Sequence, residues 1–247
     1  MFVLWLNEHI VEQARKKMAL NERQHQIFDI TQQKKRVSVE YLAKKLYVSE
    51  MTIRRDLKLM EDEGLIKRYH GGALVHNDYV QYPLYLRMRV NEKEKRDLAQ
   101  KAMRYIHDGQ TIFLNNSSSC AYIISSLKSY KDITVITNSV QFVLALSKLG
   151  VRCILTGGEY SKSERCLTGR DAENYLRSVN TDIAFLSCDG ISDDGMVTVN
   201  DADKAESVRI AFKNAKKRIF LAHHSKLGSK YTHNICERDE ADEIIVF

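Results

Sequence analysis

The chain has 247 residues, of which 44% are hydrophobic and 28% are charged. This length favours one large domain or a small module joined to a medium one, and the composition excludes a chain that is disordered throughout. With 38 Lys and Arg residues against 32 Asp and Glu residues, the net charge is +6, which fits nucleic acid or an anionic ligand without requiring either.

The five cysteines are widely spaced and form no CxxC pair, so neither a disulfide framework nor a zinc module is indicated. A reducing cytoplasm fits this usage best. The apolar start at residues 2–6 is too short for a secretion signal, and polar residues follow it at once. No other stretch approaches the ~18 uninterrupted apolar residues of a membrane span, so we expect a cytoplasmic protein with no membrane contact.

Positive charge is concentrated early in the chain, with 14 Lys and Arg residues against 10 Asp and Glu residues over residues 1–76. Asn21, Ser38 and Ser49 are predicted N-caps in this region. Apolar residues follow each cap at helical spacing, so helices are expected over about residues 21–33, 38–46 and 49–63. A tight turn at residues 47–48 joins the last two helices.

The third predicted helix carries residues that suit the major groove of DNA. Ile53 and Leu57 project from its buried side, whereas Arg54, Arg55 and Lys58 face away from it. Two short helices with a tight turn, the second basic near its N-terminus, suit insertion into the ~12 Å major groove. An isolated arginine pair is more often a solvated basic face, and the neighbouring segments decide between the two interpretations.

The next segment, residues 65–74, contains two short runs that can pair as the wing of a winged helix-turn-helix. Lys67, Arg68 and His70 would lie along a phosphate backbone. Gly71 and Gly72 allow a turn with positive φ or a close approach to the sugar edge of the DNA.

Residues 77–90 contain the only proline and have no clear period, so a linker is predicted there. Beyond it, strand-like and helical runs alternate. Strands are expected at residues 111–114, 134–137, 151–155, 183–188, 218–222 and 243–247. Helices are expected at residues 91–104, 120–127, 140–148, 171–177 and 202–215. This alternation predicts an α/β domain with a mostly parallel sheet, which binds ligands beyond the carboxyl ends of its strands.

Four predicted strand ends carry polar or glycine clusters, at residues 115–119, 137–139, 156–159 and 223–226. A hydroxyl-rich loop that runs into a helix N-terminus offers backbone N–H groups to a phosphate, and Lys226 adds positive charge. The alternative is that Ser117, Ser118 and Ser119 only cap the following helix.

These residues resemble the DeoR-type bacterial transcriptional regulators. In the first half the resemblance rests on residues 49–57, 63–66 and 68–73. In the second half it rests on residues 137–139, 157–158, 168–169, 182–190 and 225–226. It covers nearly the whole chain from about Met18.

The resemblance implies a winged helix-turn-helix over residues 18–76 and a sensor domain over residues 91–247, similar in fold to ribose-5-phosphate isomerase. It implies a sequence-specific regulator, more often a repressor of carbohydrate-metabolism genes, that binds double-stranded DNA and a small anionic effector such as a sugar phosphate. No cofactor and no metal are expected. Because one recognition helix covers few bases, a homodimer or homotetramer is expected.

The resemblance and the residue chemistry together give two sets of candidate site residues, with Asp56 expected to be structural. The DNA-binding set is Ser49, Thr52, Arg54, Arg55, Lys58, Lys67, Arg68 and His70. The effector-binding set is Asn115, Ser117, Ser118, Ser119, Thr137, Asn138, Gly157, Gly158, Asp189 and Lys226.

The chain departs from the family at two places. Where the family usually has Asp-x-Gly-Ser/Thr-Thr, residues 115–119 read Asn-Asn-Ser-Ser-Ser, without the carboxylate and without the glycine. Where it usually has Ala-Asp-Ser-Ser-Lys, residues 222–226 read Ala-His-His-Ser-Lys. We therefore expect a pocket less negative than that of relatives, selective for something other than the common sugar phosphates.

A sugar-phosphate isomerase-like enzyme with an appended helical domain is the alternative function. Its chemistry needs a carboxylate base near a lysine or a second acid. Asp189 supplies one acid, but Ser192 stands where related enzymes tend to place another, and Lys204 is predicted to lie on a solvated helix face. A metal site at His223 and His224 is disfavoured because adjacent residues at a strand end point in opposite directions.

Residues 1–17 precede the usual start of the family. Either this extension is the product of an upstream start codon, or residues 2–11 form an amphipathic segment that packs on another subunit.

Overall fold

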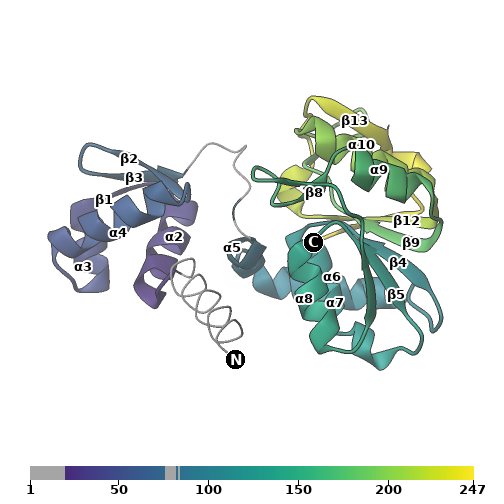
Figure 1. The fold of residues 1–247 in the computed structure, drawn as a ribbon. Coiled ribbons are helices and arrows are strands. Elements are labelled where there is room, and N and C mark those ends of the chain that lie inside the picture. Colours follow the sequence, from purple (N-terminus) through teal and green to yellow (C-terminus); the bar gives the residue numbers. More distant parts are fainter. Residues whose placement is uncertain (1–19, 76–81, 83) are drawn as a thin grey trace. The chain divides into compact units, whose positions relative to one another are not determined.

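The computed structural model describes residues 20–75, 82 and 84–247. The chain divides into two compact units, Met1–Val80 and Gln81–Phe247, which are described separately (Figure 1). The N-terminal extension predicted at residues 1–17, and most of the first half of the predicted linker, lie outside the described residues.

Residues 20–75, the described part of the first unit, form three helices and three strands. In chain order they are α2 (Glu22–Lys34), β1 (Arg36–Ser38), α3 (Val39–Leu46), α4 (Glu50–Asp62), β2 (Ile66–Tyr69) and β3 (Gly72–Val75). All three predicted N-caps are confirmed, because the side chains of Asn21, Ser38 and Ser49 each accept a hydrogen bond from a backbone N–H three residues later. The helices pack around Phe28, Leu42 and other fully buried apolar residues.

The wing is a three-stranded antiparallel sheet in the order β1-β3-β2, one strand more than predicted. Gly71 has a φ of +92°, as the predicted turn requires. Gly72 allows a close approach within the protein rather than to the DNA. A Cβ there would collide with the carbonyl of Val37 and the ring of Tyr69. The Tyr69 hydroxyl donates to that same carbonyl at 3.1 Å, so the glycine lets the ring lie across the sheet.

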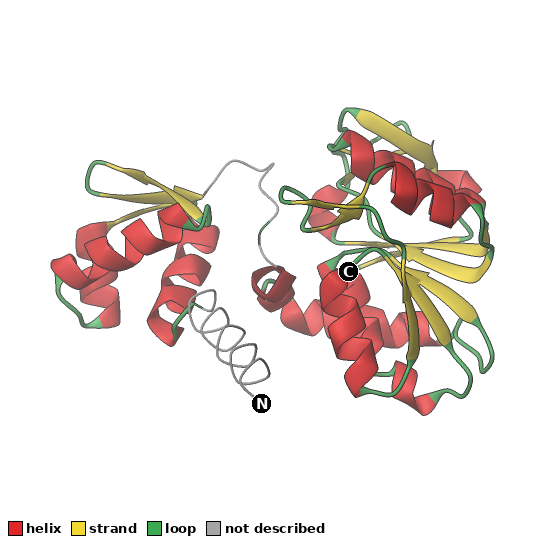
Figure 2. Cartoon of the chain, in the orientation of Figure 1, coloured by secondary structure: helices red, strands yellow, loops and turns green. Residues whose placement is uncertain are grey.

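The second unit is an α/β domain built on a six-stranded parallel sheet in the order β14-β12-β9-β4-β5-β6 (Figure 2). These strands are the six that the sequence predicts, with ends shifted by three residues at most. Their bounds are β4 (Thr111–Leu114), β5 (Thr134–Thr137), β6 (Arg152–Leu155), β9 (Thr181–Leu186), β12 (Ala215–Ala222) and β14 (Glu243–Val246).

Helices cover both faces of this sheet, because its strands are apolar on both sides. On β4, Ile112 and Leu114 pack into one buried cluster with the helices α6 (Glu92–Met103), α7 (Ser118–Ile124) and α8 (Val140–Lys148). Phe113, between them in the chain, packs into a second cluster with the helices α9 (Arg170–Arg177) and α10 (Ala202–Lys213). Continuous apolar runs such as these are expected of buried parallel strands.

Several short elements were not predicted. They are the hairpin β7 (Glu159–Ser161) and β8 (Cys166–Thr168), the antiparallel sheet of β10 (Gly190–Ile191), β11 (Met196–Val199) and β13 (His233–Glu237), and the 3-10 turns η1 (Leu127–Ser129), η2 (His224–Lys226) and η3 (Arg238–Glu240). All of them lie beside the six-stranded sheet or connect its strands.

The predicted linker needs a correction, because it contains a helix, α5 (Leu84–Arg89). Leu84 and Leu86 are buried, and Leu84 belongs to the same apolar cluster as α6 and α7. The segment is therefore part of the second unit. Within the described residues, no helix is both long enough and apolar enough to cross a membrane.

Candidate DNA-binding face and candidate effector site

The exposed side of α4 carries the predicted DNA-binding residues. Arg54, Arg55 and Lys58 are exposed, whereas Ile53 and Leu57 are buried, as the helical wheel predicts. Arg54 is held by Glu50 through an ion pair of 2.8 Å. In the described part of the chain Arg55 has no such partner, so its guanidinium is available to a base or a phosphate.

The start of α4 has a structural role. The Ser49 side chain accepts from the backbone N–H of Thr52 at 3.2 Å, and the two hydroxyls lie 2.9 Å apart. The cap fixes the first turn of the helix, so the exposed N-terminal residues keep one orientation.

Asp56 is structural, as expected. Only 3% of it is exposed, and its carboxylate accepts from Arg23 Nε at 2.6 Å and from Gln24 Nε2 at 3.1 Å. The hydrogen bond to Asp56 raises the pKa of Arg23. This ion pair connects α2 to α4 and thereby fixes the rotation of the recognition helix about its axis.

The wing presents Lys67, Arg68 and His70 at the surface. The Arg68 backbone N–H donates to Glu61 Oε1 at 2.9 Å, and its guanidinium lies 3.7 Å from the same carboxylate. Since Glu61 is on α4, this contact ties the wing to the recognition helix. Among the described residues, neither Lys67 nor His70 has a side-chain hydrogen bond or ion pair of this kind.

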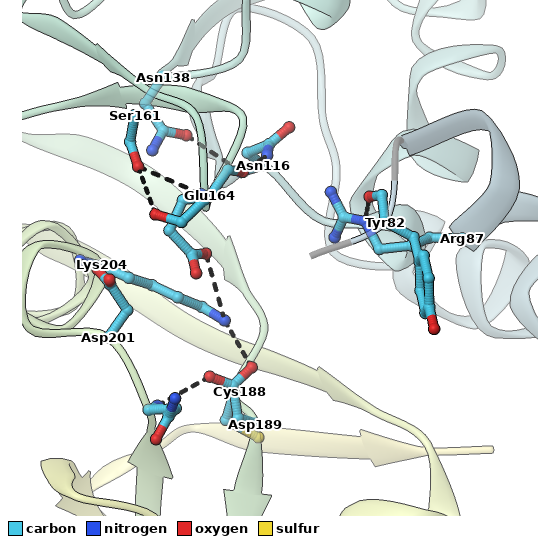
Figure 3. A network of polar contacts seen from close by, with 12 residues as sticks. Tyr82, Arg87, Asn116, Asn138, Ser161, Glu164, Cys188, Asp189, Asp201 and Lys204 are labelled. Atoms are coloured by element: carbon cyan, nitrogen blue, oxygen red, sulfur yellow. Dashed lines mark hydrogen bonds and ion pairs between the residues drawn. The ribbon is translucent and has the colours of Figure 1, made fainter. Parts of the chain in front are cut away.

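In the second unit, polar residues from distant segments meet at the carboxyl edge of the parallel sheet (Figure 3). Asn116 follows β4, Asn138 follows β5, and Asp189 lies just beyond β9. The backbone N–H of Asn116 donates to Asn138 Oδ1 at 3.1 Å, and Asn116 Nδ2 donates to the carbonyl of Glu164 at 2.9 Å. The predicted convergence of strand-end loops therefore exists.

A small cavity of about 10 Å³, comparable to one water molecule, lies at this edge. Its lining residues are Phe113, Asn115, Asn116, Asn138, Glu164, Cys166, Lys204, Ser207 and Val208. Four of its polar residues belong to no predicted set: Asn116, Glu164, Lys204 and Ser207. Side chains, rather than open space, occupy most of the site.

The prediction that Lys204 lies on a solvated helix face is wrong. Its side chain is only 10% exposed, and Nζ lies 2.5 Å from Asp189 Oδ1 and 3.9 Å from Glu164 Oε2. Burial opposes the charge on Lys204, but the two carboxylates outweigh it and raise the lysine pKa. Burial also opposes the charge on Asp189, yet the attraction of Lys204 and Lys226 lowers that pKa. At Glu164 burial prevails, and the pKa is raised.

Three more cations lie close to this network. Lys226 donates to the carbonyl of Cys188 at 2.5 Å, and burial lowers its pKa. Burial, and then the charges of Lys226 and Arg87, lower the pKa of Lys95 on α6. Burial also lowers the pKa of Arg87 on α5, although Glu164 acts in the opposite direction. Arg87, Lys204 and Lys226 therefore lie near the carboxylates of Glu164 and Asp189, and Lys95 lies near Arg87 and Lys226.

Within the serine loop, Ser117 has the capping role that the alternative interpretation gave to all three serines. Ser117 Oγ accepts from the backbone N–H of Cys120 at 3.1 Å and forms the N-cap of α7. Its φ of −136° is extended backbone, so this position does not require glycine. Asn115 Oδ1 accepts from the Cys120 thiol at 3.4 Å, and burial raises the pKa of that thiol to about 12. Ser119 is buried and Ser118 is half-buried in the first turn of α7.

Other predicted effector residues have structural contacts. Thr137 Oγ1 donates to the carbonyl of Leu114 at 2.7 Å, which joins β5 to β4. Gly157 and Gly158 are exposed and do not line the cavity. Gly158 has a φ of +100°, and a Cβ there would collide with the carbonyl of Thr168. Its absent side chain therefore permits packing against β8.

Of the two histidines after β12, His223 contacts neighbouring polar side chains. The imidazole Nε2 of His223 lies 2.6 Å from Asn91 Nδ2, and its Nδ1 lies 2.8 Å from Ser225 Oγ. His224 is exposed. Within the described residues, no three His, Cys, Asp or Glu side chains are grouped so as to hold a metal ion.

Comparisons with known proteins agree with this arrangement. The family model of the DeoR-like helix-turn-helix domain matches residues 23–78, and that of the DeoR C-terminal sensor domain matches residues 90–246. The chain is 34% identical over 230 residues to the HTH-type transcriptional repressor GlcR of Bacillus subtilis (strain 168), covering 92% of this chain and 88% of that protein. It is 28% identical over 212 residues to the glycerol-3-phosphate regulon repressor of Escherichia coli (strain K12), covering 85% and 84%.

Among solved structures, ribose 5-phosphate isomerase from Plasmodium falciparum is similar, with 20% sequence identity and a TM-score of 0.41 over 55% of this chain and 53% of that chain. The two family models together cover the recognition helix, the wing and the whole parallel sheet. The chain belongs to the DeoR family of DNA-binding transcriptional regulators, which is a family of regulators and not of enzymes.

Proposed function

We propose that this regulator represses carbohydrate-metabolism genes and that a phosphorylated sugar or a related small anion binds at the carboxyl edge of the parallel sheet. The observation that carries the proposal is the excess of buried cations there. Arg87, Lys204 and Lys226 lie near the carboxylates of Glu164 and Asp189, and Lys95 lies near Arg87 and Lys226. Because buried charge is costly unless it is paired, the site favours an anionic ligand, such as a phosphate monoester.

The carboxylates and side-chain amides of the site can bind the part of the ligand that does not carry the phosphate. Asp189 and Glu164 accept hydrogen bonds, and the side-chain amides of Asn116 and Asn138 both donate and accept. These groups suit the hydroxyls of a sugar or polyol. The relative that is named as a glycerol-3-phosphate regulon repressor supports a phosphorylated polyhydroxy compound as the chemical class.

The test is a thermal-shift panel on the full chain. It contains glucose 6-phosphate, fructose 1-phosphate, ribose 5-phosphate, glycerol 3-phosphate and the unphosphorylated form of each. We expect at least one phosphorylated compound to stabilise the protein and its unphosphorylated partner to have no effect. Failure of every phosphorylated compound, or equal effects within each pair, would contradict the proposal.

A matched pair of variants tests the location of the site. Lys226→Met removes a cation that faces the network, whereas Lys230→Met removes an exposed lysine that pairs with Asp194. The first should reduce the stabilisation by the phosphorylated compound, and the second should leave it unchanged. The compound that binds should then release an operator fragment selected from genomic DNA, as measured by fluorescence anisotropy.

We further propose that the regulator acts as a homodimer or homotetramer in the cytoplasm, where bacterial DNA is found. One recognition helix reads few base pairs, and paired half-sites require two copies of α4. Sedimentation that detects only monomer at micromolar concentration, with and without operator DNA, would contradict the oligomer.

A further inference from the structure

Arg87, on α5, has an unsatisfied hydrogen-bond donor that faces the proposed effector site. Its Nε donates to the carbonyl of Tyr82 at 2.9 Å, but its Nη2 is buried and has no hydrogen-bond partner among the described residues. In Figure 3 the guanidinium points toward the loops that carry Asn116 and Glu164. A buried guanidinium nitrogen without an acceptor is costly, so the position suits a negatively charged group that is brought by a ligand.

Asn116 has the complementary group. Its Nδ2 is used by the carbonyl of Glu164, which fixes the orientation of the amide and leaves Oδ1 as the acceptor. That Oδ1 is also buried and unpaired within the described residues. A ligand that has an anionic oxygen near a hydroxyl would satisfy both atoms, with the oxyanion accepting from Arg87 and the hydroxyl donating to Asn116.

The helix that carries Arg87 depends on the second unit for its order. It has six residues, fewer than an isolated helix needs to be stable in water. Lys95 Nζ donates to the carbonyls of Arg87 and Val90 at 2.5 and 2.7 Å, and the Tyr122 hydroxyl donates to the carbonyl of Met88 at 2.9 Å. Side chains of α6 and α7 therefore bind the unsatisfied carbonyls at its C-terminal end.

In the chain, α5 lies close to the boundary between the two units. The division between the two units falls between Val80 and Gln81, so α5 is the first helix after the DNA-binding unit. A ligand that stabilises α5 acts on the segment through which the two units are covalently joined.

We propose that Arg87 couples the effector site to α5: an oxyanion bound by its Nη2 holds this helix against the second unit. This inference rests on the effector site proposed above and adds its means of regulation. Because linkage is reciprocal, an ordered α5 also raises the affinity for the anion. Effector binding thereby changes the order of the segment that leads to the recognition helix.

Hydrogen exchange on the full chain tests the coupling, with inorganic phosphate as the probe and chloride of equal ionic strength as the reference. In the wild type we expect phosphate to slow amide exchange over residues 84–90 by about tenfold, which corresponds to one charge-assisted hydrogen bond. In Arg87→Met, phosphate should give no protection of this segment. In Arg89→Met, which alters an exposed arginine of the same helix, the protection should persist.

The wild-type measurement decides the question even if Arg87→Met folds poorly. No phosphate protection of residues 84–90 in the wild type, or equal protection in Arg87→Met, would overturn the coupling. A sugar phosphate that binds and releases operator DNA while exchange of α5 is unchanged would overturn the coupling and leave the proposed function intact. Phosphate protection of α5 that depends on Arg87, together with failure of the whole sugar-phosphate panel, would support the coupling and refute the proposed effector class.

Discussion

Lys204 Nζ and Asp189 Oδ1 lie 2.5 Å apart, which joins the first turn of α10 to the segment that follows β9. Glu164, at the turn of the β7–β8 hairpin, lies on the other side of the same ammonium at 3.9 Å. A single lysine thus neutralises two carboxylates that come from separate parts of the chain, and it is the central cation of the proposed effector site.

Lys204→Met should destabilise the chain by about 3 to 5 kcal/mol, because it leaves buried carboxylates without their cation. In the wild type the lowered pKa of Asp189 contributes stability above pH ~4, and this contribution is lost as the pH falls. In the variant both carboxyls should have raised pKa values, so protonation relieves the repulsion between them. The deficit in the free energy of unfolding should therefore shrink between pH 7 and about pH 4.5. Lys213→Met, which alters an exposed lysine at the other end of α10, is the control in urea unfolding.

Arg55→Ala should weaken operator binding by about 1 to 3 kcal/mol if the guanidinium reads a base in bidentate fashion. Arg55→Lys separates base reading from charge, because lysine keeps the positive charge but cannot form two parallel hydrogen bonds. We expect Arg55→Lys to keep affinity for random DNA and to lose preference for the operator in fluorescence anisotropy. Unchanged operator affinity in Arg55→Ala would remove this residue from the site.

Lys67→Ala should act through the phosphate backbone. It should lower affinity for operator and random DNA alike, and it should reduce the slope of log K against log salt concentration by about one. A titration from low to moderate salt with both DNA fragments measures this. A loss confined to the operator would contradict a phosphate contact.

The double substitution Asn115→Asp, Ser117→Gly restores the residues usual in the family. Each buried charge-assisted hydrogen bond contributes ~1.5 to 3 kcal/mol, so we expect affinity for ordinary hexose or pentose phosphates to rise at least about tenfold. Loss of the Ser117 cap should cost α7 only a few tenths of a kcal/mol when glycine replaces it. Strong binding of such a phosphate by the wild type, weakened in the double variant, would show that the two departures do not alter selectivity as predicted.

Lys95 should make stability depend on pH in the alkaline range. Burial, followed by the charges of Lys226 and Arg87, lowers its pKa from 10.5 to about 8. Between these values the unfolded chain binds this proton more fully than the folded chain, so its contribution to the free energy of unfolding rises with pH. Between pH 7.5 and 9.5 the wild type should gain about 2 kcal/mol relative to Lys95→Met. Urea unfolding measures the difference, and the exposed Lys93→Met should behave as the wild type does.

The elements that the sequence predicts are those with strong local signals. Caps at Asn21, Ser38 and Ser49 and the apolar periodicity behind them define the first three helices. The central strands β4, β5 and β9 are mostly apolar runs, and the C-terminal half of β12 is apolar as well. The short strands β7, β8 and β10 have two or three residues each, and their pairing depends on tertiary contacts that have no local signature.

The sequence predicts where the candidate effector site lies, but it predicts only some of the residues that form it. Strand-end position identifies Asn138, Asp189 and Lys226, because parallel strands end at a common edge. Lys204 and Glu164 carry no such signal, because a lysine in the first turn of a helix and a glutamate in a polar hairpin are both usually solvated. Arg87 was missed because α5 is too short to show a period. Only the tertiary packing decides that these charges are buried.

The ion pair between Asp56 and Arg23 separates the attachment of α4 from the choice of DNA sequence. Arg55 and Asp56 are neighbours in the chain, yet one faces solvent and the other is 3% exposed and bound to α2. Substitutions at the outward positions of α4 can therefore accumulate without loosening the attachment of the helix. On the predicted DNA-contact role of Thr52, Arg54 and Arg55, we expect that exchanging these residues alone would retarget the same scaffold to a new operator, provided that Asp56 is kept.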